Sequence, residues 1–308
     1  MIRAYFGHHK CGSTWIRNIV EGVLNEIGIV HRLAVDPNTP SGHGPLTDYH
    51  EEFTRDEIAS WVKRNNLGFV SFITADQSQA DALPGVKGFH VIRDPRDIIV
   101  SAYFSHRNSH PTEGLDHLAE HREKLKSVSE EEGLMLEMDF SASELNDLNL
   151  WNYNNPDILE LKMERITSCS YEPFIEIFRF LDLLEEKSTY PASRRTQVYV
   201  NAMRNRLARR GGLFAGLRQE VAAAPELVLG RVFDFRFEKI SGGRKKGTED
   251  TSSHYRKGVA GDWKNYFNAE HCTEFNSRFS GILQATGYES DDAWIEGQIR
   301  SLEGLKTV

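Results

Sequence analysis

The sequence predicts an α/β fold in a single domain, with a central, mostly parallel sheet flanked by helices. Helical patterns separate short apolar runs that have the length of buried strands, at residues 2–6, 68–73, 86–92 and 158–163. The 308 residues are enough to bury a large core, and no internal repeat or low-complexity segment divides them. We therefore expect one domain over residues 1–308.

Two helices carry clear boundary signals. Within Ser13–Ile27, apolar residues recur at three- and four-residue spacing, and Gly28 follows where helices commonly end. A second helix is predicted from Pro95, because proline suits the first helical turn and Asp94 suits the N-cap. A third helix is expected near residues 174–181, after the last predicted strand.

Two stretches interrupt this alternation. Residues 36–49 (DPNTPSGHGPLTDY) are rich in Pro, Gly and Asp, which predicts a loop. Residues 194–224 are helical in composition and rich in arginine. We interpret the arginines as one solvated helix face, and the alternative is a surface that meets an acidic partner.

The charge balance is acidic, with 37 basic against 45 acidic residues and a net charge of −8. The surface as a whole should therefore repel nucleic acid, and a polyanionic ligand would need a local cluster of positive charge. The 39% hydrophobic and 27% charged residues are ordinary for a globular enzyme.

The cysteines and the apolar runs indicate a cytoplasmic protein without a membrane span. The three cysteines are odd in number and widely spaced, so they predict neither a disulfide framework nor a metal site; they are Cys11, Cys169 and Cys272. No stretch reaches the ~18–20 apolar residues of a membrane helix. Residues 1–6 (MIRAYF) lead directly into a predicted strand, as expected for a chain without a signal peptide.

A first candidate site lies at residues 7–15 (GHHKCGSTW), between a predicted strand and a predicted helix. Small residues before a helix let backbone N–H groups converge on an anion, and Lys10 would add a full charge. The glycine spacing matches G-x-x-x-x-G-K-[ST], but Ser13 stands at the lysine position. The loop is thus P-loop-like without being a nucleotide triphosphatase motif, and a plain tight turn is the alternative.

The second candidate lies at residues 91–101 (VIRDPRDIIVS). Arg93 stands at the carboxyl end of a predicted strand, where open α/β sheets bind ligands. Ser101 follows about two helical turns later, so both can reach one phosphate if the helix folds back beside the strand end. Arg96 and Asp97 could instead form a structural ion-pair network.

The third candidate lies at residues 255–267 (YRKGVAGDWKNYF). Arg256 and Lys257 beside Gly258 would make a flexible clamp for a polyanion, although basic turns with glycine are also common on surfaces.

Together the three segments resemble the sulfotransferases that use 3′-phosphoadenosine 5′-phosphosulfate (PAPS), and in particular the cytosolic type. Residues 9–15 (HKCGSTW) are similar to the 5′-phosphosulfate loop P-K-S-G-T-T-W, and residues 93–101 to the 3′-phosphate segment. Residues 256–267 match R-K-G-x-x-G-D-W-K-N-x-F almost letter for letter. The similarity extends to residues 159–183, and residues 235–237 resemble the adenine-contacting T-S-F.

The resemblance implies transfer of a sulfuryl group from PAPS to a hydroxyl or amine by in-line displacement, leaving adenosine 3′,5′-diphosphate. Lys10 would contact the 5′-phosphate and the bridging oxygen, and Trp15 and Phe237 would contact adenine. The backbone amides expected to hold the 5′-phosphate are those of Cys11, Gly12, Ser13 and Thr14. The residues expected to grip the 3′-phosphate are Arg93, Ser101, Arg256, Lys257 and Gly258. No metal is implied, because the protein's own cations replace it.

The general base departs from the family pattern. Cytosolic members carry a histidine in K-T-H-L-P, whereas residues 69–77 here read FVSFITADQ. Other members draw a base from the loop after the first helix, and here that loop offers Asp36, His43, Asp48 and His50. We favour Asp36 or His43, with Asp76 third. We interpret His9 as structural and Cys11 as a substitute for serine.

Two other functions remain open, a P-loop kinase or nucleotide hydrolase and an inactive nucleotide-binding relative. The absent G-K-[ST] and the clamp at residues 256–258 oppose the kinase, and the absent histidine favours the inactive relative. The expected acceptor is a small molecule, a glycan or a lipid. We expect residues 36–50 and 190–225 to form loop and helical insertions on the acceptor side.

Overall fold

The computed structural model describes residues 1–34, 55–185 and 192–305. Its centre is a five-stranded, all-parallel sheet in the order β2-β3-β1-β4-β5, which confirms the predicted fold class. The strands are β1 (Arg3–Gly7), β2 (His31–Ala34), β3 (Phe69–Phe72), β4 (Lys87–Ile92) and β5 (Ile158–Lys162). Only β2 was not expected, because its four residues, HRLA, include just one large apolar side chain.

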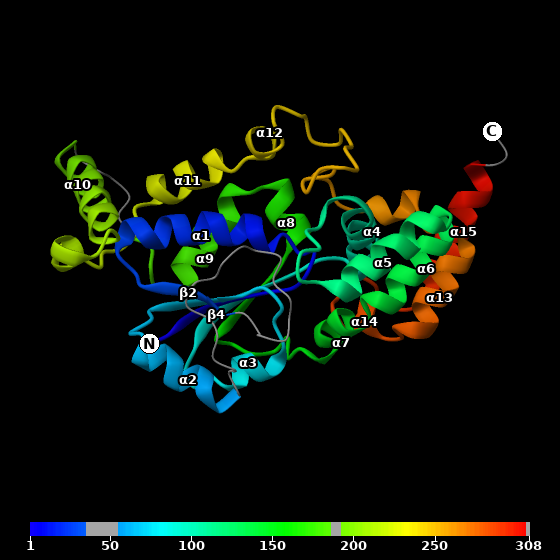
Figure 1. The fold of residues 1–308 in the computed structure, drawn as a ribbon, viewed down its shortest axis with the longest axis horizontal. Coiled ribbons are helices and arrows are strands. Elements are labelled where there is room, and N and C mark those ends of the chain that lie inside the picture. The colour runs from blue at the N-terminus through cyan, green and yellow to red at the C-terminus, as the bar shows by residue number, and fades with distance from the viewer. Residues whose placement is uncertain (35–54, 186–191, 306–308) are drawn as a thin grey trace.

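Helices cover both faces of this sheet (Figure 1). On one face, α1 (Ser13–Ile27), α9 (Tyr171–Phe180) and α11 (Pro225–Asp234) bury a core of aliphatic and aromatic side chains against the strands. On the other face lie α2 (Arg55–Arg64) and α3 (Gln77–Asp81), which enclose a second cluster with Phe6 and Phe72. Two-sided burial explains why the central strands β1, β3 and β4 are mostly apolar.

The first helix ends as its sequence predicts. Gly28 has φ 83°, and its N–H donates to the carbonyl of Leu24. A side chain is disfavoured at such an angle, so glycine terminates α1 and turns the chain toward β2. At the second predicted helix, α4 (Pro95–Phe104), the carboxylate of Asp94 accepts the N–H of Arg96, which confirms the N-cap.

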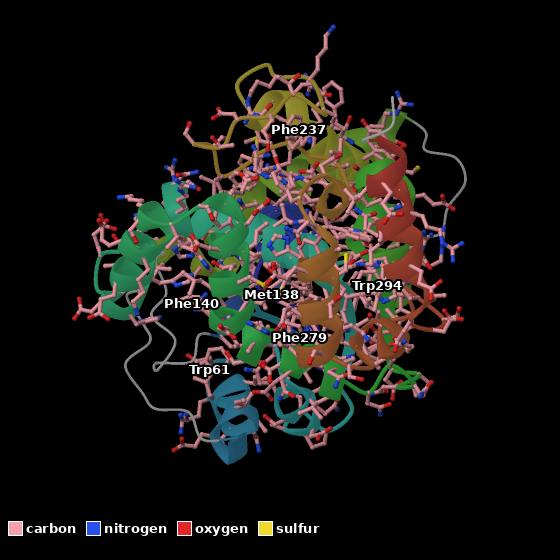
Figure 2. All side chains as sticks on the ribbon, turned by 90° about the vertical axis from the view of Figure 1, so that its right-hand side faces the viewer. Trp61, Met138, Phe140, Phe237, Phe279 and Trp294 are labelled. Carbon is pink, nitrogen blue, oxygen red and sulfur yellow. The ribbon has the colours of Figure 1, made fainter. Side chains whose placement is uncertain are left out.

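A separate helical layer stands beyond the carboxyl ends of the strands and was not predicted. It combines α4 and the π-helical turn η1 (Ser105–Ser109) with helices from the middle and the end of the chain. These are α5 (Asp116–Ser127), α6 (Glu130–Phe140), α7 (Ala142–Leu150), α13 (Ala269–Arg278), α14 (Ile282–Ala285) and α15 (Ala293–Leu305). Met138 and Trp294 belong to its buried core, and Figure 2 shows Trp61 of α2 well apart from them.

The arginine-rich segment is helical only in its first part, α10 (Ala192–Ala208) and the 3₁₀ turn η2 (Gly212–Leu217). It packs against α1 at the end of the molecule opposite α15 (Figure 1). Arg206 reaches the buried Glu26, and Arg194 pairs with Glu185 at 2.8 Å. These two arginines therefore hold α10 in place through ion pairs, in addition to giving the helix a charged face.

Three short helices complete the described chain: α8 (Met163–Ser168), α12 (Phe237–Ile240) and the 3₁₀ turn η3 (Asp262–Asn265). No helix within the described ranges has both the length and the apolar character needed to cross a bilayer.

Candidate functional site

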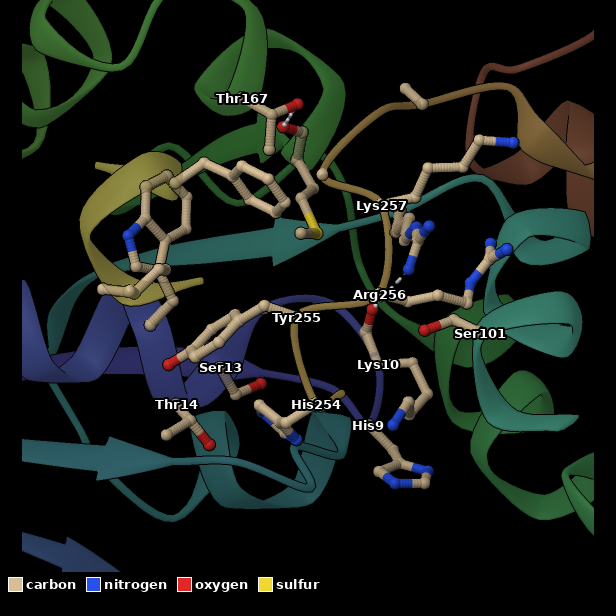
Figure 3. Close-up of a pocket in the computed structure, with 18 of the residues that line it drawn as sticks. His9, Lys10, Ser13, Thr14, Ser101, Thr167, His254, Tyr255, Arg256 and Lys257 are labelled. Carbon is tan, nitrogen blue, oxygen red and sulfur yellow. Dashed lines mark hydrogen bonds between the residues drawn. The ribbon is translucent and has the colours of Figure 1, made fainter. Parts of the chain in front are cut away.

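A cavity of about 720 Å³ opens at the carboxyl ends of the strands, where the three predicted segments meet. Figure 3 shows His9 and Lys10 on the loop after β1, Ser101 on α4, and Arg256 and Lys257 on the segment that crosses above them. This edge of an open parallel sheet is where such folds bind ligands, and the volume lies within the range of ~300–1,000 Å³ typical of ligand pockets.

The loop between β1 and α1 has the shape of an anion cradle. Lys10 and Gly12 both have positive φ, at 61° and 73°, which turns the backbone sharply into α1. The hydroxyl of Ser13 donates to the carbonyl of His8 at 2.7 Å, which fixes the turn. The first-turn amides of α1 have no carbonyl partner within the helix, as at any helix start, and Ser13 and Thr14 line the cavity.

Lys10 lies partly buried among other cations. Burial, together with repulsion from Arg93 and Arg256, lowers the pKa of Lys10 to about 7 against the opposing attraction of Glu137. A bound anion would supply the missing counter-charge and favour the ammonium form. The loop therefore holds a cation whose charge depends on what occupies the cavity.

The second segment reaches the same cavity by folding back as expected. Arg93 follows β4 directly, and its guanidinium donates to the carbonyl of Lys10 at 3.1 Å. Ser101 stands on α4, two turns further on, and also lines the cavity. The two side chains thus lie at one end of the cavity beside the first loop.

Arg96 and Asp97 turn away from the cavity and form structural contacts. The guanidinium of Arg96 donates to Asp94 at 2.8 Å and lies 3.9 Å from the centre of the Trp263 ring. The carboxylate of Asp97 is fully buried and accepts the N–H groups of Gly261 and Trp263 at 2.7 and 2.8 Å. Asp97 therefore ties the third segment to α4.

The two basic residues of the third segment share one carboxylate, and Arg256 also pairs with Glu249. Arg256 and Lys257 donate to opposite oxygens of Asp262 at 2.5 and 2.6 Å. Burial alone would raise the pKa of Asp262, but hydrogen bonds from Lys257, Asn265 and Arg256 lower it overall. An ionised Asp262 keeps both cations charged and pointed at the cavity.

Phe237 lines the cavity and packs directly against Gly258. The φ of Gly258 is +70°, and a Cβ atom placed there would come within 2.5 Å of the Phe237 ring. Trp15 lies on the same side and donates its indole N–H to the carbonyl of Phe235 at 2.8 Å. Trp15 and Phe237 thus give this side of the cavity two aromatic side chains, which suit an aromatic ring.

Every residue predicted to contact the nucleotide lines the cavity, except Cys11. The amide of Cys11 donates to the carbonyl of His8 at 3.2 Å, and its side chain is buried in the helical layer. This amide already has a carbonyl partner, and its expected contact with the 5′-phosphate stays a prediction. Burial raises the pKa of the thiol to about 12, which fits a substitute for serine rather than a redox switch.

Of the predicted bases, only Asp76 lies among the described residues. Asp36, His43, Asp48 and His50 lie outside the described residues. The carboxylate of Asp76 caps α3 by accepting the N–H of Gln79 at 3.1 Å, and Asp76 does not line the cavity. Asp76 therefore has a structural role that sequence reasoning missed. No described residue of 192–225 lines the cavity either, so the acceptor-side placement of that segment stays a prediction.

Sequence reasoning also missed a group of histidines in the cavity wall: His106, His110, His117 and His254. The first three follow Ser101 within a few turns, and this run of histidines is the signal that could have found them. His106 donates or accepts through Nδ1 at 3.0 Å from the buried Glu137, and His121 lies 3.0 Å from the other oxygen of Glu137. The helical layer thus contributes ionisable side chains to the site.

The cavity has the local positive charge that an acidic chain needs for an anionic ligand. Among the described residues that line it, six are Lys or Arg and three are Glu. The basic residues are Lys10, Arg93, Arg236, Lys246, Arg256 and Lys257.

The fold and this site define an α/β protein with a cavity rich in basic residues at the carboxyl edge of a parallel sheet. No protein-family model matches the sequence. No curated protein matches it either. Among solved structures, the chain is similar to mouse sulfotransferase SULT7A1 complexed with PAP, with 13% identity, a TM-score of 0.48, and coverage of 97% of this chain and 89% of that one. It is also similar to retinol dehydratase in complex with androsterone and inactive cofactor PAP, with 14% identity, a TM-score of 0.44, and coverage of 92% and 80%.

Proposed function

We propose that the protein is a sulfotransferase that moves a sulfuryl group from PAPS to a hydroxyl or amine of an acceptor. The observation that carries the proposal is the meeting of three sequence-distant motifs, all similar to those of PAPS-dependent sulfotransferases, around one cavity. Each motif supplies the chemistry that its part of such a donor requires.

The residues present fit the donor. A compact cation and the amides at the start of α1 suit a 5′-phosphosulfate, which is anionic at neutral pH. The cationic group at the other end suits a second phosphate; it consists of Arg93, Arg256 and Lys257, with the hydroxyl of Ser101 beside it. The wall of Trp15 and Phe237 suits adenine.

The chain's own residues would then carry out most of the catalysis. Sulfuryl transfer, like phosphoryl transfer, passes through a loose in-line transition state in which charge spreads over oxygens, so positioning and positive charge do most of the work. Lys10 lies where it can stabilise the charge that grows on the leaving oxygen. Arg93 holds the carbonyl of Lys10 at 3.1 Å, so the donor-binding segments are mechanically connected.

The experiment is an acceptor panel of phenols, alcohols, amines, glycans and lipids, incubated with PAPS while release of adenosine 3′,5′-diphosphate is monitored. We expect acceptor-dependent release that persists in EDTA, because the cations of the cavity take the place of a metal. A strict Mg²⁺ requirement with nucleoside triphosphate turnover would instead support the kinase.

A binding measurement tests the nucleotide part separately. Arg93→Ala should weaken binding of adenosine 3′,5′-diphosphate ten-fold or more, since a charge-assisted contact to phosphate contributes about 1.5–3 kcal/mol. Binding of 5′-AMP, which lacks the 3′-phosphate, should change much less. Arg300→Ala on the exposed surface of α15 is the matched control and should leave both affinities unchanged. Equal losses for the two nucleotides in Arg93→Ala would contradict the assignment.

A further inference from the structure

His106 occupies an unusual position in the cavity wall. It lies in the π-helical turn η1, directly after α4, and only 3% of the residue is exposed. Its Nδ1 lies 3.0 and 3.1 Å from the two carboxylate oxygens of Glu137. Nε2 is on the opposite edge of the ring, and no described residue forms a hydrogen bond with it. Because His106 lines the cavity, Nε2 is the ring atom available to a ligand there.

Glu137 is a buried anion with a full set of donors. It is completely buried on α6 and accepts from His106, from Nε2 of His121 at 3.0 Å and from the hydroxyl of Ser141 at 2.7 Å. Burial alone would raise the pKa of Glu137, but the charge and hydrogen bonds of these partners outweigh it and lower the pKa to about 2. The carboxylate therefore stays ionised at neutral pH.

An ionised partner at Nδ1 selects one form of the imidazole. The Nδ1–H donates to Glu137, so in the neutral ring Nε2 carries the lone pair. A carboxylate in this position also stabilises the imidazolium that forms when Nε2 takes a proton. His106 is thus oriented and electrostatically prepared to accept a proton from a group inside the cavity.

His106 also lies beside the loop that carries Lys10. The ring of His9, the residue before Lys10, stacks on His106 with centroids 5.1 Å apart and an interplanar angle of 15°. Lys10 and Glu137 are near enough for their charges to interact. The ionisable or charged groups around His106 are His9 from the loop, His110 from the end of η1, His121 and Arg122 from α5, and Glu137 from α6.

We propose that His106 is the general base of the reaction and that Glu137 is its positioning residue. The inference rests on the sulfuryl transfer proposed above, and it gives the role to a described residue in place of Asp36 or His43. The acceptor oxygen or nitrogen forms a bond to sulfur while the bond from sulfur to the bridging oxygen breaks. The electron pair of that bond stays on the 5′-phosphate oxygen beside Lys10. The proton of the acceptor passes to Nε2 of His106 and then to solvent.

The first experiment compares turnover and nucleotide binding in His106→Gln and the wild type. Turnover should fall about 10²- to 10⁴-fold, the range that a positioned general base contributes. Affinity for adenosine 3′,5′-diphosphate should stay within about two-fold, because no described residue that is expected to hold a phosphate forms a hydrogen bond with the imidazole of His106. Imidazole added to His106→Gly should restore part of the activity. His31→Gln, a histidine that does not line the cavity, is the matched control and should keep wild-type activity.

A pH profile separates a catalytic role from a structural one. In the wild type, kcat/KM should rise with pH as the base loses its proton, and this limb should vanish in His106→Gln. In Glu137→Gln the limb should move to lower pH, because the lost negative charge had favoured the protonated imidazole. A merely structural Glu137 would lower the amount of folded enzyme without moving the limb.

The outcomes distinguish this inference from the proposed function. If the wild type turns over and His106→Gln stays within about three-fold of it, while Asp36→Asn or His43→Gln is inactive, the base lies in residues 36–50 and this proposal is overturned alone. A wild type that binds no adenosine 3′,5′-diphosphate and transfers no sulfuryl group would overturn the proposed function, and this inference with it.

Discussion

The guanidinium of Arg256 donates at 2.5 Å to the buried carboxylate of Asp262, which lies six residues further along the chain. Lys257 donates to the other oxygen of that carboxylate at 2.6 Å. Two adjacent cations would otherwise repel each other, and the shared anion lets both face the cavity. Within the third motif, Asp262 therefore orients Arg256 and Lys257.

Asp262→Asn should weaken binding of adenosine 3′,5′-diphosphate about ten-fold, because Arg256 and Lys257 lose the charge that orients them. Binding of 5′-AMP should fall less. Isothermal titration calorimetry with both nucleotides checks this. Asp250→Asn is the control, because the Asp250 carboxylate binds Ser252 and contacts neither Arg256 nor Lys257. This variant should bind both nucleotides like the wild type. An unchanged affinity in Asp262→Asn would show that the two cations are oriented without it.

Gly258→Ala should weaken nucleotide binding more than Gly261→Ala does. Both glycines have positive φ, at +70° and +75°, so both substitutions carry backbone strain of about 1 kcal/mol or more. Only at Gly258 would the new Cβ collide with the Phe237 ring, at 2.5 Å, whereas nothing lies within 4 Å at Gly261. The comparison of dissociation constants and melting temperatures for the two variants isolates the effect of displacing Phe237. Equal affinities in the two variants would contradict a role of this ring in binding.

Arg96→Met should destabilise the protein by about 3 kcal/mol, because it leaves the buried Asp94 without its partner. It also removes the cation that lies between the rings of Trp263 and Trp294. Urea denaturation measures the loss, and nucleotide affinity of the folded fraction should stay within about two-fold. Arg93→Met should show the opposite pattern, with weak nucleotide binding and only a small decrease in the free energy of unfolding. A large loss of affinity in Arg96→Met with unchanged stability would place Arg96 in the site.

Nucleotide binding should take up a proton through Lys10. The pKa of Lys10 is lowered to about 7 in the empty cavity, and a bound phosphate raises it by favouring the ammonium form. Above pH 7, binding must therefore add a proton to Lys10, and the affinity for adenosine 3′,5′-diphosphate should fall as the pH rises from 7 to 9. Calorimetry at pH 8 in buffers of different ionisation enthalpy measures the uptake. Lys10→Gln should abolish it, and an identical uptake in that variant would assign the proton to another group.

By itself, the sequence determined the fold class and the three segments that meet at the cavity. Strands and helices with strong periodicity, such as β4 and α1, are specified by local patterns of apolar residues and by caps such as Asp94 and Gly28. The motifs at residues 7–15, 93–101 and 255–267 also follow from local sequence, since each lies in a loop or at a helix start. The first two motifs meet because parallel strands end at one edge of the sheet. The third follows no strand and is tied to them by the hydrogen bonds that Gly261 and Trp263 donate to Asp97.

Tertiary structure alone decided which side chains of those motifs face the cavity. Arg93 and Arg96 are both arginines of one short segment, yet one lines the cavity and the other packs between two tryptophans from a distant part of the chain. The partnership of His106 with Glu137 is equally invisible to local patterns, because 31 residues separate them and two helices must pack to bring them together. Orientation and protonation depend on such long-range packing, since burial and neighbouring charges act through space and not along the sequence.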